Sequence, residues 1–384
     1  MRKNTNIRML TAHNFLMGFV LFSPVAILYF QRVAGSFALG MSIFSAAVFS
    51  TAVFEVPTGV ISDRVGRRLT IILGSVCYLL AYIFYAVGIS YLYLLAGAIL
   101  AGIGRAFYSG NNHALLYDTL KENGLEDKYE HYLGKTMSAE HLSLAISAGL
   151  GGVLASVSFK LVMWLSVAPQ LFNLFVSFLF YEPQTTTNKI ETNVYAHFKR
   201  SLVKFISSKK IRVLTAASSL SYAFSEASFQ FRAAFVKQLW PVWALGIPSI
   251  LSHIGASVGY YWSGSIIRKA GAKLVVVGGN LFSRVISLVS FCFPTVISPL
   301  LLAAPSFLYG VKQTAKNNLF QREFSDEQRA TMSSINSLLG SILFGIGSLA
   351  IGFLADAVGP TNTLIIAQLI TLFPLGLYFY FFKL

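Results

Sequence analysis

Long apolar stretches separated by short polar segments recur from one end of the chain to the other. Most stretches hold roughly 20 apolar residues, enough for a helix to cross about 30 Å of hydrocarbon. The pattern therefore predicts an all-α membrane protein with twelve transmembrane helices. The predicted spans are 9–30, 38–61, 70–89, 92–117, 137–158, 161–181, 212–234, 242–266, 273–295, 299–320, 332–355 and 362–382.

The longest polar interruption, Glu182 to Arg212, lies near the middle of the chain and separates six predicted spans from six. We therefore predict an N-terminal six-helix bundle over 1–181, a cytoplasmic linker over 182–211 and a C-terminal six-helix bundle over 212–384. Within the linker, Val194–Ile206 places its apolar residues on one helical face. This segment is predicted either as an amphipathic helix on the membrane surface or as a solvated linker.

The composition agrees with a membrane protein, because 55% of the 384 residues are hydrophobic and only 12% are charged. The net charge of +15 comes from basic residues scattered through short loops rather than gathered on one polar face, which argues against nucleic-acid binding. With both termini cytoplasmic, most of these basic residues fall in cytoplasmic segments, as the positive-inside rule requires. We predict a multi-pass protein of the cytoplasmic (inner) membrane in that orientation.

The sequence lacks the usual motifs of metal sites and phosphate-binding enzymes. It contains no HExxH, paired CxxC or phosphate-loop pattern. Its two cysteines, Cys77 and Cys292, fall inside predicted spans, where a thiol acts as a small apolar side chain. We therefore expect a protein that is not an enzyme and that has no cofactor, metal site or disulfide.

Short motifs repeat between and within the two halves. The stretch "GVISDRVGRR" (59–68) shares its spacing of glycines and basic residues with "GSIIRKAGAK" (264–273), at the same place in the second half. A further echo, "GFLADAVG" (352–359), falls on the opposite membrane face in the predicted topology. Parallel halves that each contain inverted repeats are typical of alternating-access transporters.

The first of these stretches resembles the loop between the second and third helices of the major facilitator superfamily of secondary transporters. "FEVPTG" (54–59), "ALLYDTLKE" (114–122), "YEP" (181–183) and "DEQRATMSS" (326–334) are similar to stations of its smaller permeases. The resemblance covers nearly the whole chain and implies two pseudo-symmetric six-helix bundles. The residues that match the loop motif are Gly59, Asp63, Arg64, Gly66, Arg67 and Arg68.

A gate is expected around this loop. Glycines allow close approach and a tight turn, and arginines hold the loop in the cytoplasm. Asp63 can pair with Arg67 four positions on, and Asp118 can complete the charge cluster. The resemblance implies that this cluster latches the halves in the outward-facing state; topogenic charge alone is the simpler alternative.

Polar residues recur at helical spacing in four predicted spans, and the resemblance implies that these spans, the first, fourth, seventh and tenth, line a central cavity. Hydrogen bonds between helices are the alternative role, and Lys316 is near enough to the cytoplasm to snorkel. The candidate substrate-binding residues are Asn14, Arg105, Tyr108, Asn112, Tyr222, Glu226, Gln230, Tyr309, Lys312, Gln313 and Lys316.

The charge balance inside the spans favours an anionic solute. Glu226 is the only acid near mid-membrane, whereas Arg105, Arg284 and Lys312 are cations that hydrocarbon does not tolerate unpaired. We therefore favour a proton-coupled transporter of a carboxylate, phosphate ester, siderophore or other polyoxygenated solute. Arg284 lies in the ninth span and can instead face a carbonyl or a neighbouring helix.

Two other functions remain open. A proton-coupled multidrug exporter of cationic or lipophilic compounds would use Glu226, with His113 or His253 as further proton-coupling candidates. A receptor or sensor on a transporter scaffold would bind its ligand without moving it. In each case the expected partners are a small solute, protons and membrane lipid, with no nucleic acid, and the protein is expected to be a monomer.

Overall fold

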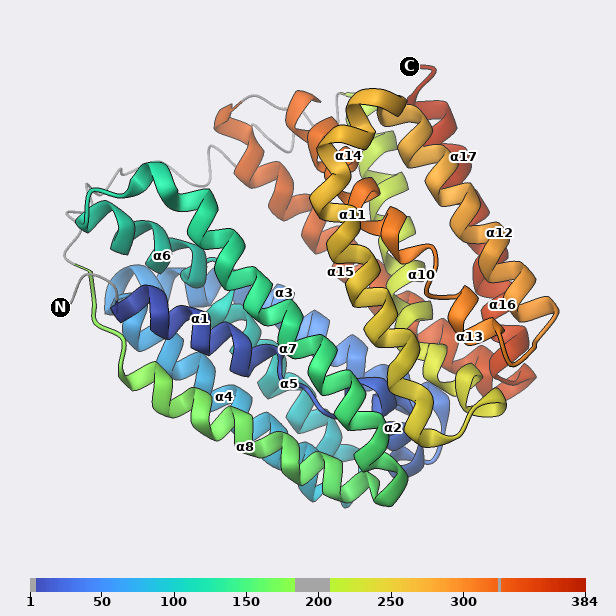
Figure 1. Cartoon of the computed structure of the whole chain (residues 1–384), viewed down its shortest axis with the longest axis horizontal. Helices are drawn as coiled ribbons and strands as arrows, with labels where there is room; N and C mark the ends of the chain where they lie inside the picture. The colour runs from blue at the N-terminus through green and yellow to red at the C-terminus, as the bar shows by residue number, and fades with distance from the viewer. Residues whose placement is uncertain (1–4, 184–207, 324–325) are drawn as a thin grey trace. The chain divides into compact units, whose positions relative to one another are not determined.

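The computed structural model describes residues 5–183, 208–323 and 326–384, apart from the side chains of Asp63 and of residues 321–335 (Figure 1). The predicted amphipathic segment Val194–Ile206 lies outside this range. The first half contains α1 (Thr5–Gly18), α2 (Ala26–Ala34), α3 (Phe37–Val65), α4 (Arg67–Val87), α5 (Tyr91–Tyr108), α6 (Asn111–Glu122), α7 (Tyr129–Val157) and α8 (Phe159–Phe178). The second half contains α10 (Lys209–Leu239), α11 (Gly246–Lys273), α12 (Gly279–Cys292), α13 (Ser298–Leu301), α14 (Ser306–Glu323), α15 (Asp326–Val358), α16 (Pro360–Ile370) and α17 (Leu372–Phe381).

Nine stretches of the described chain are long and apolar enough to cross a membrane. The longest, Val242–Cys292, contains both α11 and α12, and the positive φ of Gly271 (78°) breaks the helix near the end of α11. Two further long helices, α10 and α14, are less apolar because they carry the predicted polar stripes. Counted together, these elements give the twelve spans that the sequence predicts for this all-α fold.

Local sequence signals explain where several helices begin and end. The side chains of Ser36, Ser158 and Ser208 each accept a hydrogen bond from the backbone N–H three residues later, at the starts of α3, α8 and α10. The fourth span is broken between α5 and α6, where Gly110 adopts φ 79°. The predicted starts of these three spans, at 38, 161 and 212, agree with the observed helix starts to within a few residues. Other helices begin earlier than predicted where polar turns extend them beyond their apolar part.

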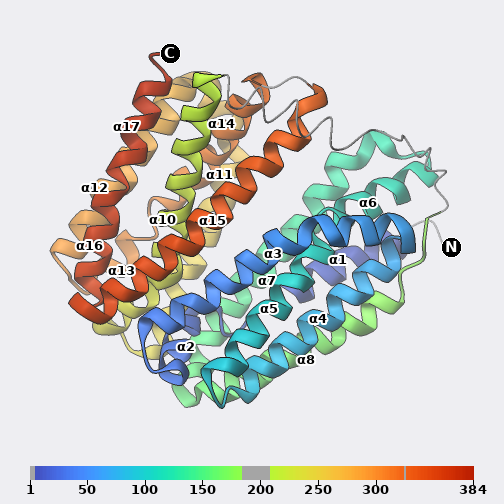
Figure 2. The ribbon, with the colours of Figure 1, turned by 180° about the vertical axis from the view of Figure 1, so that it is seen from behind.

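The chain divides into two compact units, and the first comprises 1–188 together with 241–250. In this unit α7 packs on α1, α1 on α8, and α8 on α4 (Figure 1). On the far side α4 packs on α5 and α5 on α3 (Figure 2). The segment 241–250 contacts α7 at Gly152. A Cβ there would lie 2.6 Å from the carbonyl oxygen of Trp243, so only glycine allows this approach.

The second unit comprises 189–240 and 251–384, and α10 packs in it against α14, α15, α16 and α17. Glycines bring α11 and α14 together backbone to backbone. A Cβ on Gly310 would lie 2.5 Å from the oxygen of Ala256, and one on Gly259 would fall on the carbonyl oxygen of Phe307. Small residues at helix crossings are a common device in membrane bundles, where van der Waals packing replaces the hydrophobic effect.

Large apolar side chains also cover the outside of the helices. Val56, Val157, Tyr261 and Phe293 are among those that are well exposed. An exterior of this kind suits contact with lipid tails, because hydrocarbon solvates apolar groups and would not solvate charges.

Candidate functional site

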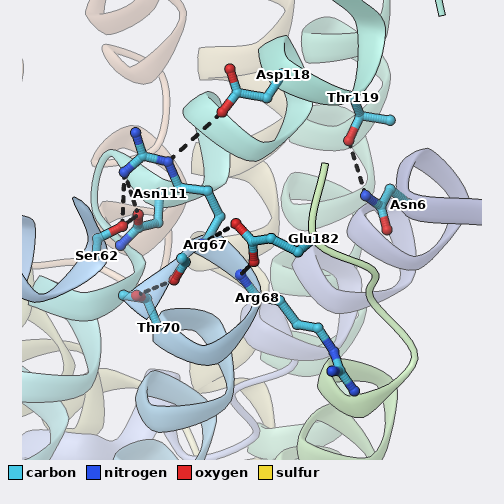
Figure 3. Close-up of polar contacts among 10 residues, drawn as sticks. Asn6, Ser62, Arg67, Arg68, Thr70, Asn111, Asp118, Thr119 and Glu182 are labelled. Atoms are coloured by element: carbon cyan, nitrogen blue, oxygen red, sulfur yellow. Dashed lines mark hydrogen bonds and ion pairs between the residues drawn. The ribbon is translucent and has the colours of Figure 1, made fainter. Parts of the chain in front are cut away.

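Arg67, the first residue of α4, lies at the centre of a polar cluster in the first unit (Figure 3). Its Nε is 3.8 Å from Oδ2 of Asp118 on α6. Its Nη1 donates to Oγ of Ser62 at 2.8 Å and to Oδ1 of Asn111 at 3.4 Å, and Ser62 also donates to Asn111. One guanidinium therefore joins the end of α3 and the start of α4 to Asn111 and Asp118 of α6.

The main chain of the same turn is held by a second carboxylate. Glu182, which follows α8, accepts the backbone N–H of Arg67 at 2.7 Å and that of Arg68 at 2.8 Å (Figure 3). The residue before them, Gly66, adopts φ 93°, and a Cβ there would lie 2.7 Å from the carboxyl carbon of Glu182. Glycine is thus required at Gly66 both for the turn and for the approach of Glu182.

The remaining motif residues have different surroundings. Arg68 donates from Nη2 to the carbonyl oxygen of Phe178 at 3.0 Å. Arg64 is exposed. At Gly59 a Cβ would meet no described atom within 4 Å, so the close approach expected of the motif glycines is seen at Gly66 and stays a prediction at Gly59. The side chain of Asp63 lies outside the described part of the structure, so its predicted pairing stays a prediction.

Three candidates in the first unit form one hydrogen-bonded group. Tyr108 donates its hydroxyl to Oδ1 of Asn14, and Nδ2 of Asn112 donates to the Tyr108 hydroxyl. His13 stacks on Tyr108 with ring centroids 5.5 Å apart. Asn14 is fully buried, at 0% exposure. The group joins α1 to α5 and α6, which matches the alternative role as hydrogen bonds between helices.

Arg105 and His113 lie outside that group. The Arg105 side chain is exposed, one turn before the break between α5 and α6. His113 is also exposed, and its Nδ1 lies 3.4 Å from the hydroxyl of Tyr129. Another proton-coupling candidate, His253, is partly buried on α11 and belongs to the second unit.

Lys312 in the second unit is held by α12. Its Nζ donates to Oδ1 of Asn280 at 3.2 Å and to Oγ of Ser283 at 3.1 Å. Both acceptors donate their own protons elsewhere, Asn280 to the oxygen of Val276 and Ser283 to that of Gly279. They are therefore oriented to accept from the ammonium group.

Arg284 is 6% exposed and bonds to neighbouring helices through neutral groups. Nη1 donates to Oε1 of Gln368 on α16 at 2.7 Å, and Nη2 donates to Oγ of Ser225 on α10 at 2.8 Å. This geometry agrees with the expectation that Arg284 faces a neighbouring helix. Like Lys312, it has no carboxylate partner among the described residues.

Replacement of Gln368 by leucine tests this arrangement. Gln368→Leu leaves one Arg284 donor buried without an acceptor, which costs about 1.5–3 kcal/mol of stability. We expect a lower midpoint of thermal unfolding for the purified protein, whereas leucine at the exposed Gln238 should change it little. Equal midpoints for the two variants would contradict the assigned contact.

The other candidates of the second unit lie on α10 and α14. Oε1 of Glu226 accepts from Nε2 of Gln230 at 2.9 Å, one turn along α10. Tyr222 on α10 is 41% exposed and Tyr309 on α14 is 47% exposed. Tyr309 meets the ring of Tyr260 edge to face, with centroids 6.5 Å apart. The candidates Gln313 and Lys316 are half-buried further along α14.

Sequence reasoning missed the partners of these residues. Glu182 was part of the "YEP" similarity, but no pattern connected it with a turn more than a hundred positions earlier. Asn280, Ser283 and Gln368 were readable only as isolated polar residues in apolar spans, a signal that gives neither direction nor partner.

Comparison with known proteins defines the class. An uncharacterized MFS-type transporter of Methanocaldococcus jannaschii is 23% identical over 381 residues, which cover 94% of each chain. An uncharacterized transporter of Buchnera aphidicola subsp. Schizaphis graminum is 27% identical over 158 residues, or 41% of this chain and 38% of the relative. Together with the twelve spans, these relatives define a multi-pass membrane transporter.

The sequence profile of the Major Facilitator Superfamily matches residues 9–348, and the chain belongs to that family. Solved structures share its fold at low identity. A mutant of the nucleoside transporter NupG is 13% identical, with a TM-score of 0.84 over 98% of this chain and 100% of that one. A bacterial homolog of the human lysosomal transporter Spinster, in an inward-facing and unoccupied conformation, is 14% identical, with a TM-score of 0.81 over 99% and 97%.

Proposed function

We propose that this protein is a secondary transporter that moves a small anionic or polyoxygenated solute, such as a carboxylate, phosphate ester or siderophore, by alternating access. The observation that carries the proposal is the environment of Lys312 and Arg284. Both cations are bonded only to neutral oxygens of the described residues. Neutral acceptors leave the positive charge uncompensated, and the buried Nε of Arg284 has no hydrogen-bond partner among the described residues. An anionic solute supplies the missing charge.

Further features support a polar solute. Arg105 is exposed within a span, where hydrocarbon contact would be costly, so it suits a watery pathway. α10 and α14, the two long helices that are less apolar than the others, carry seven of the eleven substrate-binding candidates. NupG is a nucleoside transporter, and nucleosides are polyoxygenated solutes. Sites for such solutes combine a few placed polar groups with apolar walls.

A second function, export of a lipophilic cation, is favoured by a different observation. Glu226 lies on the same helix face as the exposed ring of Tyr222, four residues earlier. A carboxylate with aromatic neighbours is suited to bind an organic cation. Proton coupling through Glu226, His113 or His253 fits either function, as does a monomer in the cytoplasmic membrane with both termini inside.

The cluster around Arg67 is proposed as the gate. It joins α3, α4 and α6 through one guanidinium, so its contacts must break before these helix ends can separate. Transport by alternating access needs such a set of contacts that is made in one state and broken in another.

A binding screen tests the proposed substrate class. Thermal shifts of the purified protein are measured with carboxylates, phosphate esters, siderophores, nucleosides and cationic drugs, followed by uptake of each hit into proteoliposomes. Arg105→Ala should weaken an anionic hit about 10- to 100-fold and a neutral analogue only slightly, because a charge-assisted hydrogen bond is lost.

The matched control is Lys160→Ala, which removes the same charge from the exposed start of α8. It should leave affinity unchanged. Stabilisation by cationic compounds alone, abolished in Glu226→Gln, would contradict the anion proposal and support the exporter.

A further inference from the structure

The segment Phe178–Glu182 begins at the last residue of α8 and is fastened to the rest of the first unit at four points. We name it the clasp. Its first carbonyl, that of Phe178, accepts from Arg68. The backbone N–H and carbonyl of Tyr181 both bond to the side-chain amide of Asn6, at 3.1 and 3.0 Å. Asn6 also donates to Oγ1 of Thr119 on α6 at 3.0 Å (Figure 3).

The two remaining points are an apolar contact of Phe180 and a pair of hydrogen bonds to the carboxylate of Glu182. Phe180 is 2% exposed and belongs to a buried cluster with Leu10, Ile71 and Leu116. Glu182 ends the clasp with both carboxylate oxygens on the first N–H groups of α4. The last residue of the clasp therefore binds the backbone of Arg67, the residue whose guanidinium forms the gate contacts.

A carboxylate suits this position for two physical reasons. The first N–H groups of a helix have no partner inside the helix, so an acceptor there satisfies them. The positive end of the helix dipole also favours a negative group. No side chain caps α4 from within its own turn, because the preceding residue is Gly66. Glu182 therefore replaces the missing cap from a distant part of the chain.

The hydrogen bonds to Glu182 also set the direction in which the Arg67 side chain extends. Its backbone N–H is fixed by Glu182, and its guanidinium reaches Asp118 and Ser62. A side chain extends from a backbone whose orientation is set by these bonds, so release of Glu182 frees the first turn of α4 to rotate. The ion pair to Asp118, already 3.8 Å long, would not survive a small rotation.

We propose that Glu182 is a positioning residue of the gate: its carboxylate holds the start of α4 so that Arg67 reaches Asp118. The chain continues from the clasp through 184–207 to the second unit, so the clasp is also the point where the linker meets the gate turn. This inference deepens the proposed gate and rests on it for its role in transport. The contact itself is tested without any substrate.

The test uses trypsin on the full-length protein purified in detergent, with mass spectrometry to follow cleavage after Arg64 and Arg68. Glu182→Ala removes two charge-assisted hydrogen bonds, so the turn should open more often and be cut roughly tenfold faster. Glu182→Gln keeps one acceptor and should give a smaller increase. The matched control is Glu126→Ala, which removes an exposed acid from η3 (Glu126–Lys128). Trypsin should cut this variant at the same rate as the parent protein.

Coupling to Asp118 distinguishes positioning from simple local stability. If Glu182 acts through Arg67, the double variant Glu182→Ala with Asp118→Asn should be cut less than the product of the two single fold-changes predicts. Fold-changes that multiply would overturn the proposal, as would a cleavage rate for Glu182→Ala no higher than that of the Glu126→Ala control. An elution profile in size exclusion that matches the parent protein confirms that each variant is folded. If Glu182→Ala is not folded, Glu182→Gln takes its place in the cleavage measurements.

Because cleavage needs no solute, its result stands whichever compound the protein carries. The cleavage rates can show that Glu182 protects the turn and is coupled to Asp118 even if the protein transports none of the screened anions. That pair of results would refute the proposed substrate class and leave the role of Glu182 intact.

Discussion

Arg67→Ala is expected to lower the turnover of transport by about 10- to 100-fold while leaving the affinity for the solute nearly unchanged. The guanidinium makes the Asp118 pair and two hydrogen bonds, and bonds to a charged group contribute about 1.5–3 kcal/mol each. A loss of about 1.4 kcal/mol from one state of the cycle already shifts a population tenfold. Initial rates of uptake into proteoliposomes, measured across solute concentrations, separate turnover from affinity.

Two variants control this experiment. Lys128→Ala removes an exposed positive charge from the neighbouring element η3 and should transport normally, which distinguishes the gate from topogenic charge. Arg67→Lys keeps the charge but loses the planar fork, so partial activity is expected. If Arg67→Ala and Lys128→Ala transported at the same rate, the gating role of Arg67 would be refuted.

Gly259→Leu is expected to have the largest effect on stability. A side chain there would collide with the carbonyl oxygen of Phe307, and backbone atoms cannot move aside as a flexible side chain can. Separating α11 from α14 would also open the contact at Gly310. We expect a loss of about 3 kcal/mol or more, seen as little monodisperse protein in size exclusion and a much lower unfolding temperature.

Gly376→Leu is the matched control. Gly376 is exposed inside α17, and a Cβ there would meet no described atom within 4 Å. This variant should express and unfold like the parent. Similar losses at the two positions would show that glycine content in a span, rather than the crossing of α11 and α14, determines stability.

The architecture could be predicted from the sequence because it depends on local patterns. Each span is a run of apolar residues long enough to cross hydrocarbon, and the polar interruption after the sixth span separates the halves. Asp118 was expected to complete the charge cluster around Arg67, and its ion pair with Arg67 agrees with that, whereas the expected pairing of Arg67 with Asp63 stays a prediction. The motif did not indicate which of its glycines makes a close contact, because a motif gives positions and not the contacts made at each one.

The partners of the buried cations were not predictable, because they depend on how helices face one another. Lys312 was expected to face a solute, and no sequence pattern indicated that its Nζ also bonds to Asn280 and Ser283 of α12. Periodicity identifies the residues that share a helix face but not the neighbour that this face meets. The same limit hid Glu182, whose contact with the start of α4 depends on the path of the chain after α8.

The bond between Lys312 and α12 bears on how the protein enters the membrane. A central lysine raises the cost of inserting a helix by about 2.5–3.5 kcal/mol, and α14 contains Lys312 and Lys316 in one span. α12 leaves the ribosome first and presents Asn280 and Ser283 as acceptors. α14 therefore enters the bilayer at lower cost as a hairpin with α12 than alone, and loss of these two acceptors would impair biogenesis before it could affect transport.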